Sequence, residues 1–160
     1  MTILQIHQNI AAHDAIGNDI EMIAKVTGRY AISVCYGEIG TSHSVPWVDS
    51  VQARRILADE DSIVIYHHSV FWEMGEKMLE NARARIIIRY HNITPPEFFA
   101  PYAGGHYAQC VRGREQTERL QQKFPNAFWL CDSEYNSGEI TNIPPQQKAV
   151  LAPFSKVETW

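Results

Sequence analysis

Polar residues that could bind a ligand or move a proton stand directly after three short apolar runs of the chain. They are His67 and His68, His91 and Asn92, and the triplet Asp132, Ser133 and Glu134. The run before each group is rich in β-branched or aromatic residues, which is typical of a strand buried on both faces of a parallel sheet. Because open α/β sheets bind ligands at the carboxyl ends of their strands, these side chains are predicted to share one ligand-binding edge.

The segment from Ile86 to Tyr102 carries the strongest of these signals. Its strand ends at His91-Asn92, and two consecutive prolines, Pro95 and Pro96, then stop sheet pairing and disfavour a helix. The resulting loop is predicted to be stiff and to present Tyr90, His91, Asn92, Thr94 and Glu97 to a ligand. The alternative is a capped strand and a rigid turn without chemistry, and these residues alone leave both interpretations open.

The first strand, predicted at 2–7, leads through a polar loop into a helix. Asn18 is a predicted N-cap with Glu21 three residues later, as in a capping box, and Gly28 ends the helix. Asp14, Gly17 and Asn18 therefore lie where backbone N–H groups at a helix start can face an anion or a sugar hydroxyl.

Other site chemistries are weaker. His7, His67 or His68, and His91 could hold zinc if their strands are neighbours, but no compact spacing such as HxxxH or CxxC is present. The sequence also lacks G-x-S-x-G, a P-loop and GxGxxG, so neither a serine hydrolase nor a nucleotide fingerprint is supported. We therefore expect no metal and no cofactor, and we single out His91 because histidines cluster at the strand ends.

Strands and helices alternate through most of the chain. Strands are predicted at 2–7, 30–36, 62–66, 85–90, 127–131 and 149–152, and helices at 18–28, 48–57, 71–81, 106–123 and 134–140. Ser69 is expected to cap the third helix. This order predicts an α/β fold, a Rossmann-like three-layer α/β/α sandwich with a mostly parallel sheet and right-handed crossovers.

Composition bounds the function classes. A length of 160 residues suits one domain, and a formal charge of −4 without a basic run gives no sign of nucleic-acid binding. The N-terminus lacks the features of a signal peptide, and no apolar run approaches the roughly 20 residues that span a bilayer. Three scattered cysteines indicate reduced thiols rather than a disulfide framework, so we expect a cytoplasmic protein.

Three segments resemble the N-terminal half of a group 1 glycosyltransferase of the GT-B type. The specific one is Arg89-Tyr90-His91-Asn92-Ile93-Thr94-Pro95-Pro96-Glu97-Phe98-Phe99; Asp14-Ala15-Ile16-Gly17-Asn18-Asp19 and Cys131-Asp132-Ser133-Glu134-Tyr135-Asn136 support it. The resemblance implies two Rossmann-like domains around a cleft, with the acceptor on the N-terminal domain and a nucleotide-sugar donor on the C-terminal one. By this resemblance His91 reaches towards the donor sugar and is the catalytic residue. Gly17 lies near the donor phosphates, although family members often carry two glycines there.

The resemblance also implies a division of the chain. Residues 1–154 would form the acceptor-binding domain and residues 155–160 would begin the interdomain linker, while the donor-binding domain, with its Glu-x7-Glu motif, is absent. The expected acceptor- and donor-binding residues are Asp14, Gly17, Asn18, His67, His68, Tyr90, Asn92, Thr94, Glu97, Ser133 and Glu134.

The function expected from the resemblance is retaining transfer of a sugar to a saccharide or lipid-linked acceptor in surface polysaccharide synthesis. The 160-residue chain alone is expected to be inactive and to form a weak homodimer through Phe98, Phe99 and Tyr102, whereas the full-length enzyme would associate peripherally with a membrane. The alternative is a non-catalytic Rossmann-like module, complete as it stands, that binds a sugar or a nucleotide.

Overall fold

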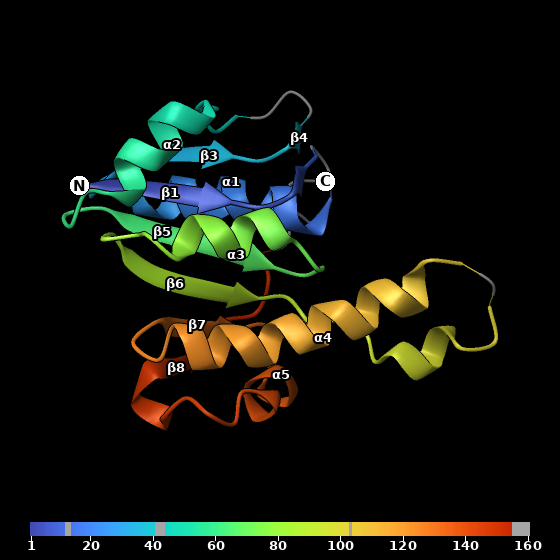
Figure 1. Cartoon of the computed structure of the whole chain (residues 1–160). Helices are drawn as coiled ribbons and strands as arrows, with labels where there is room; N and C mark the ends of the chain where they lie inside the picture. Colours follow the sequence, from blue (N-terminus) through green and yellow to red (C-terminus); the bar gives the residue numbers. More distant parts are fainter. Residues whose placement is uncertain (12–13, 41–43, 103, 155–160) are drawn as a thin grey trace.

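Six strands form one central sheet in which every strand pair is parallel (Figure 1). The structure is a computed structural model that describes residues 1–11, 14–40, 44–102 and 104–154. The strand order is β3-β1-β5-β6-β7-β8. The strands are β1 (Thr2–Ile6), β3 (Ile32–Tyr36), β5 (Ile63–His68), β6 (Arg85–Tyr90), β7 (Phe128–Cys131) and β8 (Lys148–Val150). The predicted parallel sheet is therefore confirmed.

The chain reverses its direction of winding between β1 and β5. From β1 it crosses to β3 on one side and then returns to β5 on the other side, so β1 and β5 flank the topological switch point. Short strands β2 (Asn9–Ile10) and β4 (Ile39–Gly40) pair just beyond the ends of β1 and β3. In folds of this kind the crevice at the switch point is where ligands bind.

Helices cover both faces of the sheet, as expected for a three-layer α/β/α sandwich. The helix α1 (Ala15–Thr27) packs on one face through Ile20 and Ile23. The opposite face carries the larger core, to which Leu57, Leu79 and Leu120 contribute. Its helices are α2 (Ser50–Leu57), α3 (Glu73–Leu79), α4 (His106–Lys123) and α5 (Glu134–Glu139) (Figure 1).

Two expected helix caps were wrong. Asp14, not Asn18, caps α1, because its carboxylate accepts the backbone N–H of Gly17, and the cap therefore lies four residues earlier than expected. Gly17 lies inside the first turn, where a Cβ atom would stand 1.9 Å from the carbonyl oxygen of Ala11, so glycine is required there. At α3 the N-cap is Trp72 without a side-chain cap, and Ser69 bonds elsewhere.

The proline loop leads into a segment that projects from the body. It contains the 3-10 helix η1 (Pro96–Phe99), and the first half of α4 extends beyond the sheet beside it (Figure 1). Phe98 and Tyr102 are 66% and 72% exposed, whereas Phe99 is half-buried. We call residues 96–102 with the first turn of α4 the projecting arm.

All three cysteines are free, and Cys35 and Cys131 are buried, which confirms the prediction of unpaired thiols. Within the described parts of the chain, no helix has the length and apolar character needed to cross a membrane.

Candidate functional site

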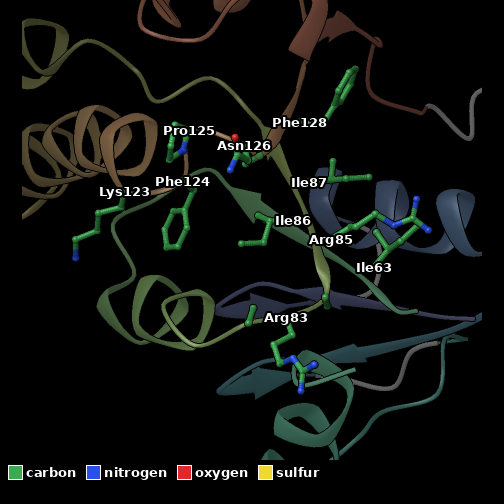
Figure 2. Close-up of a pocket in the computed structure, with 13 residues that line it drawn as sticks. Ile63, Arg83, Arg85, Ile86, Ile87, Lys123, Phe124, Pro125, Asn126 and Phe128 are labelled. Atoms are coloured by element: carbon green, nitrogen blue, oxygen red, sulfur yellow. The ribbon is translucent and has the colours of Figure 1, made fainter. Parts of the chain in front are cut away.

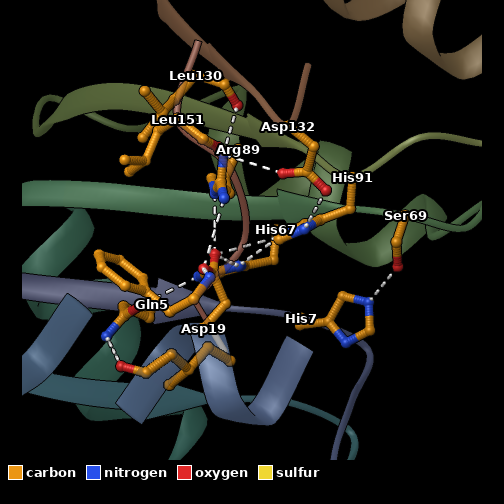
Figure 3. Close-up of polar contacts among 12 residues, drawn as sticks. Gln5, His7, Asp19, His67, Ser69, Arg89, His91, Leu130, Asp132 and Leu151 are labelled. Atoms are coloured by element: carbon orange, nitrogen blue, oxygen red, sulfur yellow. Dashed lines mark hydrogen bonds and ion pairs between the residues drawn. The ribbon is translucent and has the colours of Figure 1, made fainter. Parts of the chain in front are cut away.

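His91 follows β6 and is held between two partners at the carboxyl edge of the sheet (Figure 3). Its Nε2 lies 2.9 Å from Nδ1 of His67, the fifth residue of β5. Its Nδ1 lies 3.2 Å from Oδ2 of Asp132, which follows β7. The two imidazole rings stack with an interplanar angle of 14°. Neighbouring parallel strands thus bring together three side chains that are far apart in the sequence.

Gln5 in β1 fixes the orientation of His67. The amide nitrogen of Gln5 donates to the carbonyl oxygen of Ile20 at 2.9 Å and to Oγ of Ser33 at 3.0 Å. The amide oxygen must then face Nε2 of His67, 3.0 Å away. An amide oxygen only accepts, so Nε2 of His67 carries a proton, and in the neutral ring that burial favours Nδ1 presents a lone pair.

A buried ion-pair cluster surrounds the two histidines. Arg89 in β6 is 0% exposed and its Nε donates to Oδ2 of Asp19 at 2.9 Å, while its Nη1 lies 3.0 Å from Oδ1 of Asp132. The same guanidinium donates to the carbonyl oxygen of Leu151 at 2.8 Å. Asp19, in α1, lies 3.7 Å from Nε2 of His91. The cluster ties the only helix on its face of the sheet, among the described residues, to strands β6 and β7.

Hydrogen-bond counting assigns the charge state of His91. Nδ1 of His91 faces a carboxylate and must donate, and Nε2 faces the lone pair of His67 and must also donate. All hydrogen bonds of this arrangement are made when both ring nitrogens of His91 carry a proton. Two positive charges, on Arg89 and His91, then face two negative charges, on Asp19 and Asp132, and the buried cluster is neutral. Buried charges are tolerated when they are paired in this way.

Burial shapes the titration of the neighbouring histidines. It lowers the pKa of His67 well below the ordinary value, and the charges of His91, His7 and Arg89 act in the same direction. Burial also lowers the pKa of His7. His67 is thus the neutral member of the pair, and the proton between the two rings belongs to His91.

Asp19, His67 and His91 could together hold a metal ion, since one ligand atom from each lies within 4.8 Å of the others. Arg89, however, already donates to Oδ2 of Asp19, the oxygen nearest both rings. A divalent ion there would stand beside the guanidinium, whereas a proton between the rings leaves the cluster neutral. We therefore assign the position between His67 and His91 to a proton.

His7, at the end of β1, joins the next strand end without entering the cluster. Its Nδ1 donates to the carbonyl oxygen of Asn9 at 2.8 Å, and its Nε2 accepts from the hydroxyl of Ser69 at 2.9 Å. This hydrogen bond connects the chain after β1 to the chain after β5, on either side of the switch point (Figure 3). A zinc site of His7, His67 and His91 requires their ring nitrogens to meet at one point, but the potential metal-binding group found among the described residues contains His67 and His91 without His7.

Two predicted site residues lie on the opposite face of the sheet. His68 is fully buried and its Nε2 bonds Oγ1 of Thr117 in α4 at 2.8 Å. The hydroxyl of Tyr90 donates to Glu139 at 3.0 Å. Successive residues of a strand point to opposite faces, so His67 and His68 cannot share a site, nor can Tyr90 join Arg89. The structure therefore separates His68 and Tyr90 from His91.

The remaining predicted residues form smaller groups at the same edge. Asn92 is exposed and has a φ of 23°. Its Oδ1 accepts a hydrogen bond from the side-chain amide of Asn136, and the hydroxyl oxygen of Ser133 accepts one from the backbone N–H of Asn136. Glu97 and Glu134 are exposed and Thr94 is half-buried. Asp14 and Gly17 meet at the start of α1, and the buried Oδ1 of Asn18 has no hydrogen-bond partner among the described residues.

Gln5, Asp19 and Arg89 were missing from the predicted site, and Asp132 was expected at this edge but without a role of its own. Two of them carried a signal: Gln5 and Arg89 interrupt runs of buried apolar strand residues, and polar groups at such positions require partners. The charge of Arg89, placed in a buried strand, requires a carboxylate partner nearby. Asp19 gave no such signal, because only the packing of α1 brings it to β6.

A pocket of about 600 Å³ lies away from this cluster (Figure 2). Ile63, Arg85 and Phe128, which line it, are the first residues of β5, β6 and β7. It therefore opens at the amino ends of these strands and is not part of the candidate site at their carboxyl ends.

Comparisons with known proteins returned no match: no family model fits the chain, and neither the curated proteins nor the solved structures contain a significant relative.

Proposed function

We propose that this chain is the N-terminal, acceptor-side half of a retaining GT-B glycosyltransferase, with His91 at the reaction centre. The observation that carries the proposal is the position of His91, held by His67 and Asp132 at the carboxyl edge of β6, one strand from the switch point. The resemblance of residues 89–99 to this class of transferases supplies the reaction.

The geometry changes the role proposed for His91. The loop was expected to present the His91 side chain to a ligand, but this side chain is only 6% exposed and both of its ring nitrogens are engaged inside the cluster. His91 would therefore act through its positive charge, which stabilises the negative charge that develops on a leaving diphosphate. It would also position Asp132, which is 15% exposed and can accept a hydrogen bond from a sugar hydroxyl.

A retaining transfer passes through an oxocarbenium-like transition state. A fixed charge helps such a state because it needs no reorganisation at the moment of reaction. The buried ion pairs of Arg89 hold His91 and Asp132 in place, so the cluster fits this requirement. The donor would bind to a second Rossmann-like half, as the resemblance implies.

The test is a transfer assay on the protein of the complete natural reading frame, or on this chain with a separately encoded second half. A panel of nucleotide sugars is offered with saccharide and lipid-linked acceptors, and the anomeric configuration of the product is determined by NMR. The proposal predicts transfer with retention by the whole protein and none by the 160-residue chain alone. A reading frame without a second Rossmann-like half, with no partner chain, would favour the sugar- or nucleotide-binding module instead.

A further inference from the structure

A second pocket, of about 560 Å³, opens at the carboxyl edge between α3 and the first half of α4. Gln8, Glu38 and Val70, which line it, follow β1, β3 and β5. It therefore adjoins the hydrogen bond between His7 and Ser69, because Gln8 and Val70 are the next residues of the chain. Its volume is in the range of small-molecule sites, and the reaction proposed above assigns no role to its residues.

The carboxylate of Glu38 is held in a fixed position in this pocket. The indole N–H of Trp72 donates to Oε1 at 2.8 Å, and the amide of Gln8 donates to Oε2 at 3.4 Å. The backbone N–H of Glu38 also donates to the carbonyl oxygen of Gln8 at 3.0 Å. An ionised carboxylate has about four acceptor positions, so Glu38 retains acceptors for hydroxyl groups of a ligand.

The pocket also holds a positive charge that forms no close ion pair. The guanidinium of Arg112 lies 3.8 Å from the centre of the Phe71 ring. Lys77 and, to a lesser extent, the charge of Arg112 lower the pKa of Glu73 in the same pocket, but among the described residues Arg112 forms no direct salt bridge with that or another carboxylate. Lys77, the other strong base of the pocket, is paired with Glu73 at 2.6 Å. A guanidinium stacked on an aromatic ring presents its donors in a plane that suits a carboxylate or a phosphate.

We propose that this pocket binds a saccharide that carries an acidic group. Hydroxyl groups of the sugar would donate to Glu38, the amide of Gln109 would bond a further hydroxyl, and the acidic group would pair with Arg112. That the saccharide is the acceptor rests on the proposed function; that the pocket prefers an acidic sugar does not.

The test uses the 160-residue chain labelled with ¹⁵N and three probes: methyl β-glucuronide, glucose 6-phosphate and methyl β-glucoside. Amide shifts are followed during titration of the wild type and of Arg112→Gln and Glu38→Gln. Arg55→Gln is the control, because Arg55 is an exposed arginine on α2, outside the pocket, and its removal changes the net charge equally. Thermal unfolding of each variant shows that it is folded.

The glucuronide or the sugar phosphate should shift the amides of Glu38, Phe71 and Arg112 and bind about fivefold more tightly than the neutral glucoside, as for an exposed charge pair. The tighter binder of the two shows whether the pocket prefers a carboxylate or a phosphate as the acidic group. Arg112→Gln should remove the preference and keep the weak binding of the glucoside, Glu38→Gln should weaken all three sugars, and Arg55→Gln should change nothing. Equal binding of charged and neutral sugars, or shifts confined to other surfaces, would overturn the proposal. If the acidic sugars bind preferentially but the whole protein transfers no sugar, the pocket proposal stands and the proposed transferase function is rejected.

Discussion

Nε2 of His91 and Nδ1 of His67 face each other across 2.9 Å, and Asp132 and Gln5 hold the far sides of the two rings. One hydrogen atom between the two rings gives both facing nitrogens a hydrogen-bond partner within the buried network. The arrangement gives His91 a structural role in addition to any role in chemistry. A substitution at His91 is therefore expected to cost stability as well as activity, and the two effects have to be measured separately.

The first prediction concerns Arg89, which pairs with Asp19 and Asp132 while fully buried. Arg89→Met removes the positive charge and leaves Asp19 as a buried carboxylate without its partner. The free energy of unfolding should fall by about 3–5 kcal/mol, the usual cost of breaking a buried ion pair on one side. Urea denaturation at neutral pH measures this loss.

Arg85→Met is the matched control, because Arg85 lies on the same strand and is exposed. Its effect should stay within about 0.5 kcal/mol, as for most surface substitutions. Similar stabilities for the two variants would show that the cluster does not hold α1 to β6.

The second prediction is a loss of stability in acid that originates at His68. Burial lowers the pKa of this histidine from 6.5 to about 3, so between these values the unfolded chain binds a proton that the folded chain does not. Stability therefore rises with pH across this window and falls as the pH drops from 6.5 towards 3. One such histidine contributes a slope of up to about 1.4 kcal/mol per pH unit.

His68→Gln keeps a polar partner for Thr117 but cannot take up a proton, so its stability should vary less with pH in this window. The exposed His106 provides the control His106→Gln, which should retain the wild-type slope. Denaturant midpoints at a series of pH values decide the matter, and identical slopes for wild type and His68→Gln would refute the assignment.

The third prediction is weak self-association through the projecting arm. Phe98 and Tyr102 are more than half exposed on it, and exposed aromatic side chains on a projecting segment favour association. Light scattering should show a mass that rises with concentration, and Phe98→Ser with Tyr102→Ser should return the protein to a monomer. Tyr30→Ser, at a tyrosine 73% exposed outside the arm, should leave the mass unchanged. A strict monomer at high concentration would contradict the prediction.

The sequence predicted most of the framework, because apolar runs and helix periods are local signals. The ranges of β6 and α4 match the predicted 85–90 and 106–123. The start of α1 was misplaced because both Asp14 and Asn18 are good N-cap residues, and only the hydrogen bond from the backbone N–H of Gly17 to Asp14 in the folded chain identifies the cap.

The candidate site was predictable only in part. His67 and His91 were expected at one edge of the sheet, and the structure brings their ring nitrogens to 2.9 Å from each other. His68 belongs to the other face of the sheet, because adjacent residues of a strand point to opposite faces and His68 directly follows His67. Asp19 lies in α1 and is 70 residues from Arg89 in the sequence. A local sequence pattern cannot predict a contact between residues so far apart.

The central claim, that His91 serves the proposed sugar transfer, is tested most directly by the turnover of His91→Ala in the protein of the complete reading frame, with the melting temperature measured on the same preparation. Thr117→Val is the control, because it removes the partner of the buried His68 on the opposite face and should cost stability without touching the site. At a temperature where all three proteins are folded, His91→Ala should lose the equivalent of about 2–4 kcal/mol of barrier in kcat, while Thr117→Val keeps near-normal turnover. Near-normal turnover in His91→Ala, or a loss that only follows its unfolding, would contradict the account.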